Sequence, residues 1–147
     1  MTKRRILFIE IKNSLRLNLC QHLRQEGYAV HVAEREKEVM DVLSHSSVKV
    51  AILGLEGLKI EGLALLRMLR KQYPAVKVIT INSPDRFDLS LECMRLGAFD
   101  DFLIPFDLDT LMASLKEAFS APLQGVSPRK TQRNKIYPTR PGKGGEE

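Results

Sequence analysis

Residues 48–54, with the sequence VKVAILG, constrain the fold of this chain more than any other stretch. Only Lys49 interrupts an otherwise apolar run of strand length, and the run ends at a glycine. Such a run is typical of a strand that is buried on both faces of a parallel sheet. Functional groups in such sheets lie where the strands end at their carboxyl edge. Gly54 occupies that position here, and glycine brings no side chain for chemistry.

Short apolar runs and amphipathic segments alternate along residues 5–118. Strands are expected over residues 5–10, 28–32, 48–54, 76–82 and 100–103. Helices are expected over residues 14–25, 34–44, 62–72, 86–96 and 108–118, with residues 55–63 forming a glycine-punctuated loop before the third helix. This alternation predicts an α/β fold, a flavodoxin-like (βα)5 three-layer sandwich with a parallel sheet in the order 2-1-3-4-5. The predicted core includes Ile6, Phe8, Ile52, Leu53, Val78 and Ile79.

The composition changes after Ala121. Residues 122–147 hold four of the seven prolines and four of the nine glycines. They also carry six basic and two acidic residues, so four of the five net positive charges of the chain lie there. Because this segment has too few apolar residues to offset its ordering entropy, it is predicted to be a disordered basic tail. Residues 1–121 are predicted to form one domain.

Several classes of protein are disfavoured by the sequence. No apolar run approaches the roughly 20 residues that a membrane-spanning helix needs, and the first apolar run ends at Glu10, too early for a signal peptide. We therefore expect a cytoplasmic protein. The cysteines have no CxxC spacing and the histidines are dispersed, so reduced thiols and no metal site are expected. These residues are Cys20, Cys93, His22, His31 and His45.

Two local motifs accompany the alternating pattern. One is the glycine-containing stretch over residues 55–63, which is followed by an amphipathic segment. The other is LGAFD over residues 96–100 with PFD over residues 105–107. Over roughly residues 4–120, the chain resembles the receiver domain of two-component response regulators. The resemblance implies a domain in which Mg²⁺ and a phosphoacceptor aspartate receive a phosphoryl group from a histidine kinase.

The resemblance also implies where the functional positions of the family fall in this chain. The acidic pair falls on Glu10 and Ile11, and the phosphoacceptor falls on Gly54. The remaining positions are the hydroxyl on Asn82, the aromatic switch on Asp101 and the lysine on Ile104, which precedes Pro105. If the register in the last strand slipped by one residue, Phe102 would take the aromatic position. The Ile104–Pro105 bond is expected to be cis, as it usually is in the family.

These replacements predict a degenerate receiver, or pseudo-receiver, because phosphoryl transfer depends on a positioned nucleophile and on cations that neutralise charge. We expect no enzymatic activity, no cofactor and no metal. One alternative is an atypical response regulator that is phosphorylated at a non-standard residue, of which Glu56 is the nearest candidate. A lone carboxylate without the lysine and the acidic partner makes this alternative the weaker one.

The expected work of the domain is protein–protein interaction in a two-component or phosphorelay-type pathway. The resemblance implies docking of a signalling partner, or of a second copy, on the face formed by the fourth helix, fifth strand and fifth helix, roughly residues 86–119. A second alternative is a nucleic-acid-associated regulator that acts through the basic tail. Tyr137 is the only aromatic residue of that tail, so stacking on bases has little support.

Overall fold

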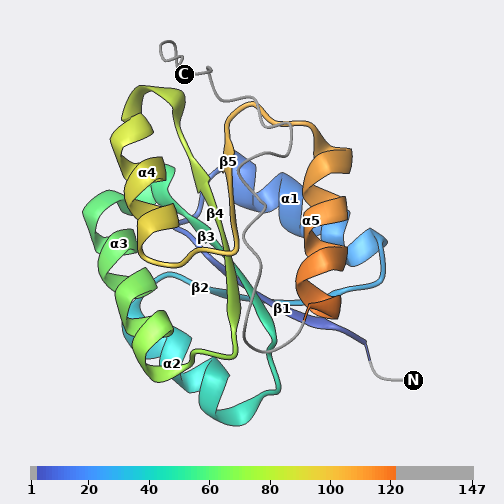
Figure 1. The fold of residues 1–147 in the computed structure, drawn as a ribbon. Coiled ribbons are helices and arrows are strands. Elements are labelled where there is room, and N and C mark those ends of the chain that lie inside the picture. The colour runs from blue at the N-terminus through green and yellow to red at the C-terminus, as the bar shows by residue number, and fades with distance from the viewer. Residues whose placement is uncertain (1–2, 122–147) are drawn as a thin grey trace.

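A five-stranded parallel sheet forms the centre of the computed structural model, which describes residues 3–121 (Figure 1). The strand order is β2-β1-β3-β4-β5, which confirms the predicted flavodoxin-like topology. Each neighbouring pair is parallel, and β3 is the central strand, between β1 and β4. The strands are β1 (Arg5–Ile9), β2 (Ala29–Ala33), β3 (Val50–Gly54), β4 (Lys77–Asn82) and β5 (Asp100–Leu103).

Helices cover both faces of the sheet (Figure 1). Two of them, α1 and α5, pack on the face that presents Ile6 and Phe8. The other three helices pack on the face that presents Leu7 and Ile9. The bounds are α1 (Ser14–Gln25), α2 (Glu36–His45), α3 (Leu55–Gln72), α4 (Phe87–Arg95) and α5 (Leu108–Ser120), with a short 3₁₀ helix, η1 (Pro84–Arg86), before α4.

The core follows from the continuous apolar character of the central strands. All residues of β3 are buried, so consecutive side chains enter the two opposite apolar clusters in turn. The six residues predicted for the core have no exposed surface. Ile52 belongs to the cluster under α1 and α5, and Leu53 belongs to the cluster under α2, α3 and α4.

The expected loop over residues 55–63 is wrong. Helix α3 begins at Leu55, directly after Gly54, and is interrupted only at Lys59, where the backbone takes φ 50° and ψ −124°. Leu55 is buried and packs against Gly62, where any Cβ would overlap the Leu55 side chain. The glycine spacing that predicted a loop therefore reflects close packing, of Gly62 against Leu55 within α3 and of Gly57 against Ile11 after β1.

The basic tail and its predicted disorder lie outside the described residues. Within residues 3–121, no helix combines the length and apolar character that crossing a membrane requires.

Candidate functional site

The carboxyl edge of the sheet brings together the positions that the sequence singled out. Gly54 ends β3 and pairs in register with Ile81, and Asn82 ends β4 and pairs with Leu103. Glu10 directly follows β1. The Ile104 amide donates to the Asn82 carbonyl oxygen over 2.9 Å, which holds the end of β5 beside β4. These residues therefore line one edge, as expected for the ends of parallel strands.

The Glu10 side chain fills the space beside Gly54. Its residue is fully buried, and its Oε1 accepts a 2.8 Å hydrogen bond from the Ile11 amide. Its Oε2 accepts a 3.3 Å hydrogen bond from the amide of Gly57. A Cβ atom on Gly54 would lie 2.8 Å from Glu10 Cδ, closer than real Cβ contacts. The carboxylate of Glu10 thus occupies the volume in which a side chain at position 54 would begin.

Glu10 is also an anion at the start of a helix. Gly54 is the N-cap of α3 and has no side chain to accept from the first amides of that helix. The carboxylate of Glu10, from the end of β1, takes one of these amides, that of Gly57. Burial raises the pKa of the Glu10 carboxyl, while the hydrogen bonds from Ile11 and Gly57 oppose that rise.

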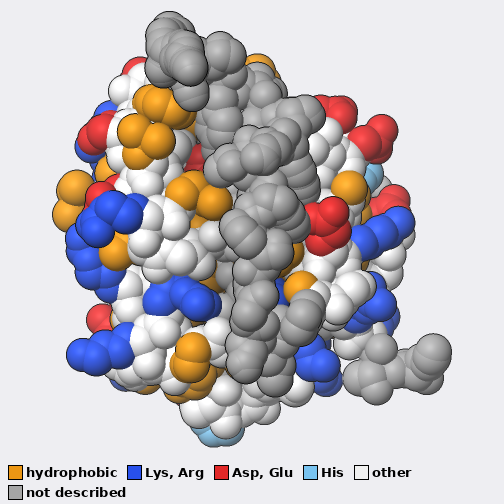
Figure 2. Space-filling model, in the orientation of Figure 1, with side chains coloured by type: hydrophobic (Ala, Val, Ile, Leu, Met, Phe, Trp, Pro, Cys, Tyr) orange, Lys and Arg blue, Asp and Glu red, His pale blue; other side chains and the backbone are white. Residues whose placement is uncertain are grey.

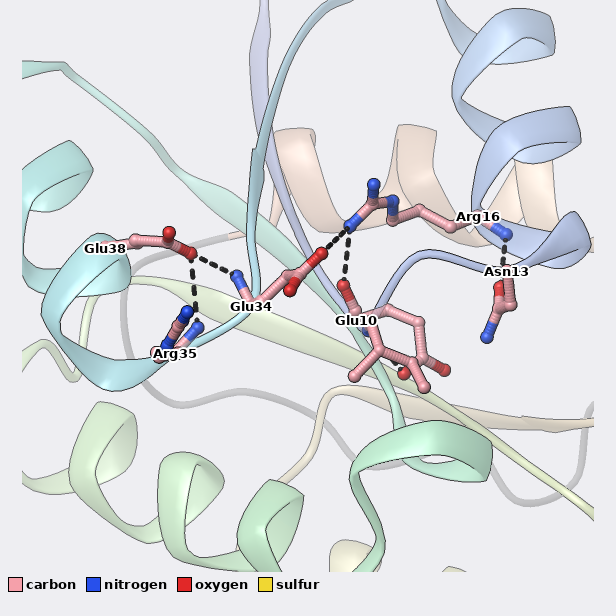
Figure 3. Close-up of polar contacts among 7 residues, drawn as sticks. Glu10, Asn13, Arg16, Glu34, Arg35 and Glu38 are labelled. Atoms are coloured by element: carbon pink, nitrogen blue, oxygen red, sulfur yellow. Dashed lines mark hydrogen bonds and ion pairs between the residues drawn. The ribbon is translucent and has the colours of Figure 1, made fainter.

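The nearest arginine does not neutralise the Glu10 carboxylate. Arg16 Nη1 donates to the backbone oxygen of Glu10 over 2.9 Å and to Glu34 Oε2 over 3.0 Å (Figure 3). Asn13 caps the helix that carries this arginine, because Asn13 Oδ1 accepts from the Arg16 amide over 2.9 Å. The Arg16 guanidinium therefore links the end of β1 to Glu34, directly after β2, and makes no hydrogen bond to the Glu10 carboxylate.

Ile11, on which the resemblance places the second position of the family's acidic pair, directly follows Glu10. It is 40% exposed, and it lies against α3 so closely that a Cβ on Gly57 would be 2.7 Å from Ile11 Cδ1. An aliphatic side chain thus lies where a second metal-binding carboxylate would be expected. No group of three or more acidic, histidine or cysteine side chains suited to a metal ion occurs within residues 3–121.

Asp101 and Asn82 are bonded to each other inside the protein. Both residues are fully buried, and Asn82 Nδ2 donates to Asp101 Oδ1 over 2.5 Å. The hydroxyl of Thr80 donates to the same carboxylate oxygen. Asn82 Nδ2 also lies 3.8 Å from Cys93 Sγ, and burial together with the Asp101 charge raises the pKa of that thiol to about 12. Thr80, Asn82 and Asp101 therefore form a buried polar cluster between β4 and β5.

Asp101 and Phe102, the two candidates for the aromatic switch position, point to opposite faces of the sheet. Asp101 points toward Thr80 on β4 and Cys93 on α4. Phe102 lies in the apolar cluster on the other face, under α1 and α5. Asp101 therefore faces α4, whereas Phe102 faces α1 and α5.

Sequence reasoning missed the roles of Thr80, Cys93 and Asp100. Thr80 lies two residues before Asn82 on β4, so the period of a strand already places both on one face. Asp100 is fully buried and accepts a 2.8 Å hydrogen bond from Ser114 on the buried side of α5. A serine inside an otherwise apolar helix face is the signal that could have identified this pair.

Ile104, on which the resemblance places the family's lysine, directly follows β5. Ile104 is half-buried and packs against the apolar cluster under α1 and α5. The Ile104–Pro105 peptide bond is cis, as predicted. Glu56, the alternative acceptor, is exposed, and its backbone oxygen accepts from Lys59 Nζ over 2.9 Å.

Comparison with known proteins agrees with this geometry. The family model of the response regulator receiver domain matches residues 6–116. An NtrX-like response regulator of Rickettsia felis is 30% identical over 120 residues, which cover 80% of this chain and 25% of that protein. The transcriptional regulator NtrC of Escherichia coli is 27% identical over 126 residues, 86% of this chain and 27% of that protein. The chain thus spans about a quarter of the length of these relatives.

Solved structures show the same fold. The receiver domain of NtrX from Brucella abortus matches with a TM-score of 0.72 at 24% identity, over 80% of this chain and 99% of that one. An N-terminal signal receiver domain from Bacteroides fragilis matches with a TM-score of 0.73 at 23% identity, over 82% of this chain and 100% of that one. From its family match, strand order and carboxyl-edge site, the chain belongs to the response regulator receiver domain family.

Proposed function

We propose that this chain is a receiver domain that cannot be phosphorylated and that acts by protein–protein interaction in a two-component or phosphorelay-type pathway. The observation that carries the proposal is the position of Glu10, whose carboxylate fills the space beside Gly54. The domain then has no catalytic activity of its own.

Among the described residues of this site, the groups that phosphoryl transfer requires are not found. A phosphoryl group is transferred when a nucleophile, a metal ion and fixed cations surround it in line. The corresponding positions here hold Gly54, Ile11 and Ile104. The carboxylate of Glu10, beside Gly54, is buried and already bonded to two backbone amides. A glutamate held in this way has no freedom to act as an acceptor in line with an incoming donor.

The buried cluster around Asp101 supports a single resting conformation. A ligand shifts a conformational equilibrium only by its differential affinity for the two states. If no phosphoryl group attaches, the equilibrium is set by the internal contacts of Asn82, Thr80 and Asp101. We infer that these hydrogen bonds hold β4 and β5 in one arrangement.

The proposed docking surface is the α4–β5–α5 face, with a signalling protein or a second copy of this chain as its occupant. Hydrophobic side chains gather over α4 in the space-filling view (Figure 2). Leu91 on α4 is 59% exposed and is available for contact with a partner. The face therefore offers apolar contact that does not depend on phosphorylation.

The backbone amide spectrum of the full chain tests the proposal. We expect no change at Gly54, Gly57 or Asn82 when Mg²⁺ and acetyl phosphate are added together, because neither has a site to bind. Saturable shifts of these amides on addition of both, absent with acetyl phosphate alone, would contradict the proposal. The Glu56→Gln variant shows whether any such shift depends on the alternative acceptor.

A further inference from the structure

We propose that the groove between α1 and the free edge of β2 binds an extended segment of another protein that carries an apolar residue and an acidic residue. The groove has a volume of about 470 Å³ and includes Leu17, Cys20, Arg24 and Val32 in its lining. It lies on β2, at the opposite edge of the sheet from β5. It is therefore a surface distinct from the α4–β5–α5 face, and the two proposals stand independently.

The backbone of β2 is open on its outer side. Among the described strands, β2 pairs only with β1. Ala29 donates to the Arg4 carbonyl over 2.9 Å, and the Ala33 carbonyl accepts from Glu10 over 3.1 Å. Because backbone groups alternate in direction along a strand, those of the intervening Val30 and Val32 point outward. An outward row of this kind is a template for a further strand.

One outward group is already used, and others remain open. Arg24 Nη2 donates to the Val30 carbonyl oxygen over 2.9 Å. Within residues 3–121, Val32 has no hydrogen-bond partner on this outer side. An extended segment can therefore pair with Val32 while Arg24 keeps its bond to Val30.

Apolar side chains lie beside this open edge. Leu17 on α1 is 62% exposed, and Val32 is 36% exposed. Cys20 lies one helical turn after Leu17 on α1 and is almost fully buried at the base of the same groove. Side chains on one face of an added strand would point toward α1, so an apolar residue of the segment would be covered between Leu17 and Val32.

The two arginines at the ends of the groove determine where the bound segment carries its acidic residue. Arg16, at one end of the groove, is paired with Glu34 at 3.0 Å. At the other end Arg24 has no carboxylate within 4 Å among the described residues, and α1 contains no acidic residue. An acidic side chain of the segment thus belongs at the Arg24 end, where the guanidinium has further donors to offer. Residues 122–147, with six basic and two acidic side chains, do not match this requirement.

Two synthetic peptides test the inference on the isotope-labelled full chain. The blocked peptides GEVTVEG and GKVTVKG share the apolar, extended pattern and differ only in charge. We expect GEVTVEG to shift the amides of Leu17, Arg24 and Val32 in a saturable manner, and GKVTVKG to leave them unchanged. Equal shifts with both peptides, shifts confined to α4 and α5, or no shifts with GEVTVEG up to millimolar concentration would overturn the proposal.

Matched variants separate the contributions. Arg24→Gln should weaken the binding of GEVTVEG by roughly tenfold, because a charge-assisted hydrogen bond is lost. Arg95→Gln, on α4, should leave it unchanged. Leu17→Ser should weaken binding, whereas Leu91→Ser, at a leucine of similar exposure, should not. If the groove amides shift with protein concentration in the absence of peptide, a second copy is the occupant and the proposal is wrong.

Discussion

The Glu10 carboxylate lies where a Cβ atom on Gly54 would be, so any side chain at position 54 requires Glu10 to move. A Cβ at position 54 would lie 2.8 Å from Glu10 Cδ, and the carboxylate cannot leave without losing its hydrogen bonds to Ile11 and Gly57. The two positions are therefore coupled: a glycine at the third strand end goes together with a buried glutamate at the first.

This coupling predicts that Gly54→Ala destabilises the domain. The added methyl group overpacks against Glu10 and should lower the free energy of unfolding by about 1–3 kcal/mol. Urea denaturation measures the change. In the Glu10→Ala variant, Gly54→Ala should lower the free energy of unfolding by less, because the obstructing side chain is gone. A double-mutant cycle should therefore give a coupling energy of about 0.5–3 kcal/mol. Simple additivity of the two substitutions would contradict the shared space.

Restoring the family's acceptor alone should not restore the chemistry. In Gly54→Asp a second carboxylate would be forced against Glu10, while aliphatic side chains at Ile11 and Ile104 would supply neither a metal ligand nor a cation. We expect this variant to be less stable than Gly54→Ala and to remain unlabelled by acetyl phosphate. Incorporation of a phosphoryl group into Gly54→Asp, seen in its intact mass, would show that the other positions are dispensable.

The pH dependence of stability should report the burial of Glu10. Burial raises the folded-state pKa of this carboxyl above its ordinary value of 4.5, so the folded protein holds the proton more tightly than the unfolded chain. The free energy of unfolding should therefore fall as the pH rises from about 4.5 through the raised pKa. The variant Glu10→Gln should lose this dependence in denaturation curves across that range.

Glu38 provides a control of opposite sign. Its pKa is lowered, mainly by the hydrogen bond from the Glu34 amide, which Figure 3 shows together with that from Arg35. Its stabilising contribution is present above the unfolded pKa and is lost as the pH falls. Replacing it by glutamine should therefore remove a dependence that runs in the other direction. A Glu10→Gln curve parallel to that of the unmodified chain would refute the assignment.

The buried bond between Asn82 and Asp101 predicts a strongly coupled pair. Removing either side chain leaves the other buried polar group with one partner fewer, at a cost of about 1–3 kcal/mol of unfolding free energy. Relaxation-dispersion measurements on β4 and α4 should show little exchange in the unmodified chain and increased exchange in Asp101→Ala. Asn18→Ala, at an exposed asparagine on α1, should change neither quantity. Extensive exchange in the unmodified chain would contradict a single arrangement.

The fold could be predicted from the sequence because its signals are local and consistent. The apolar run that ends at Gly54, the breaks at Gly27 and Gly97 and the cap at Asn13 specify strands, ends and starts without any knowledge of neighbours. Both glycines have positive φ angles in the structure, as helix-ending residues often do. Strand order followed because right-handed crossovers leave few alternatives.

The candidate site could be predicted only as a set of absences. The residue types at Ile11, Gly54 and Ile104 can be read directly from the sequence. The location of the Glu10 side chain beside Gly54 cannot, because it depends on contact between β1 and α3, which lie more than forty residues apart. The same reason hid the helical start of α3, whose glycines are explained by contacts with Leu55 and Ile11. The direction of Asp101 required the register between β4 and β5.

The central claim is tested most directly by the intact mass of the full chain after incubation with Mg²⁺ and acetyl phosphate, followed at once in the mass spectrometer. A phosphorylatable receiver domain of known activity serves as the positive control in the same mixture. We predict that the control gains one phosphoryl group while the mass of this chain stays unchanged. A Mg²⁺-dependent gain of one phosphoryl group that maps to Glu56, Glu10 or any other residue would contradict it.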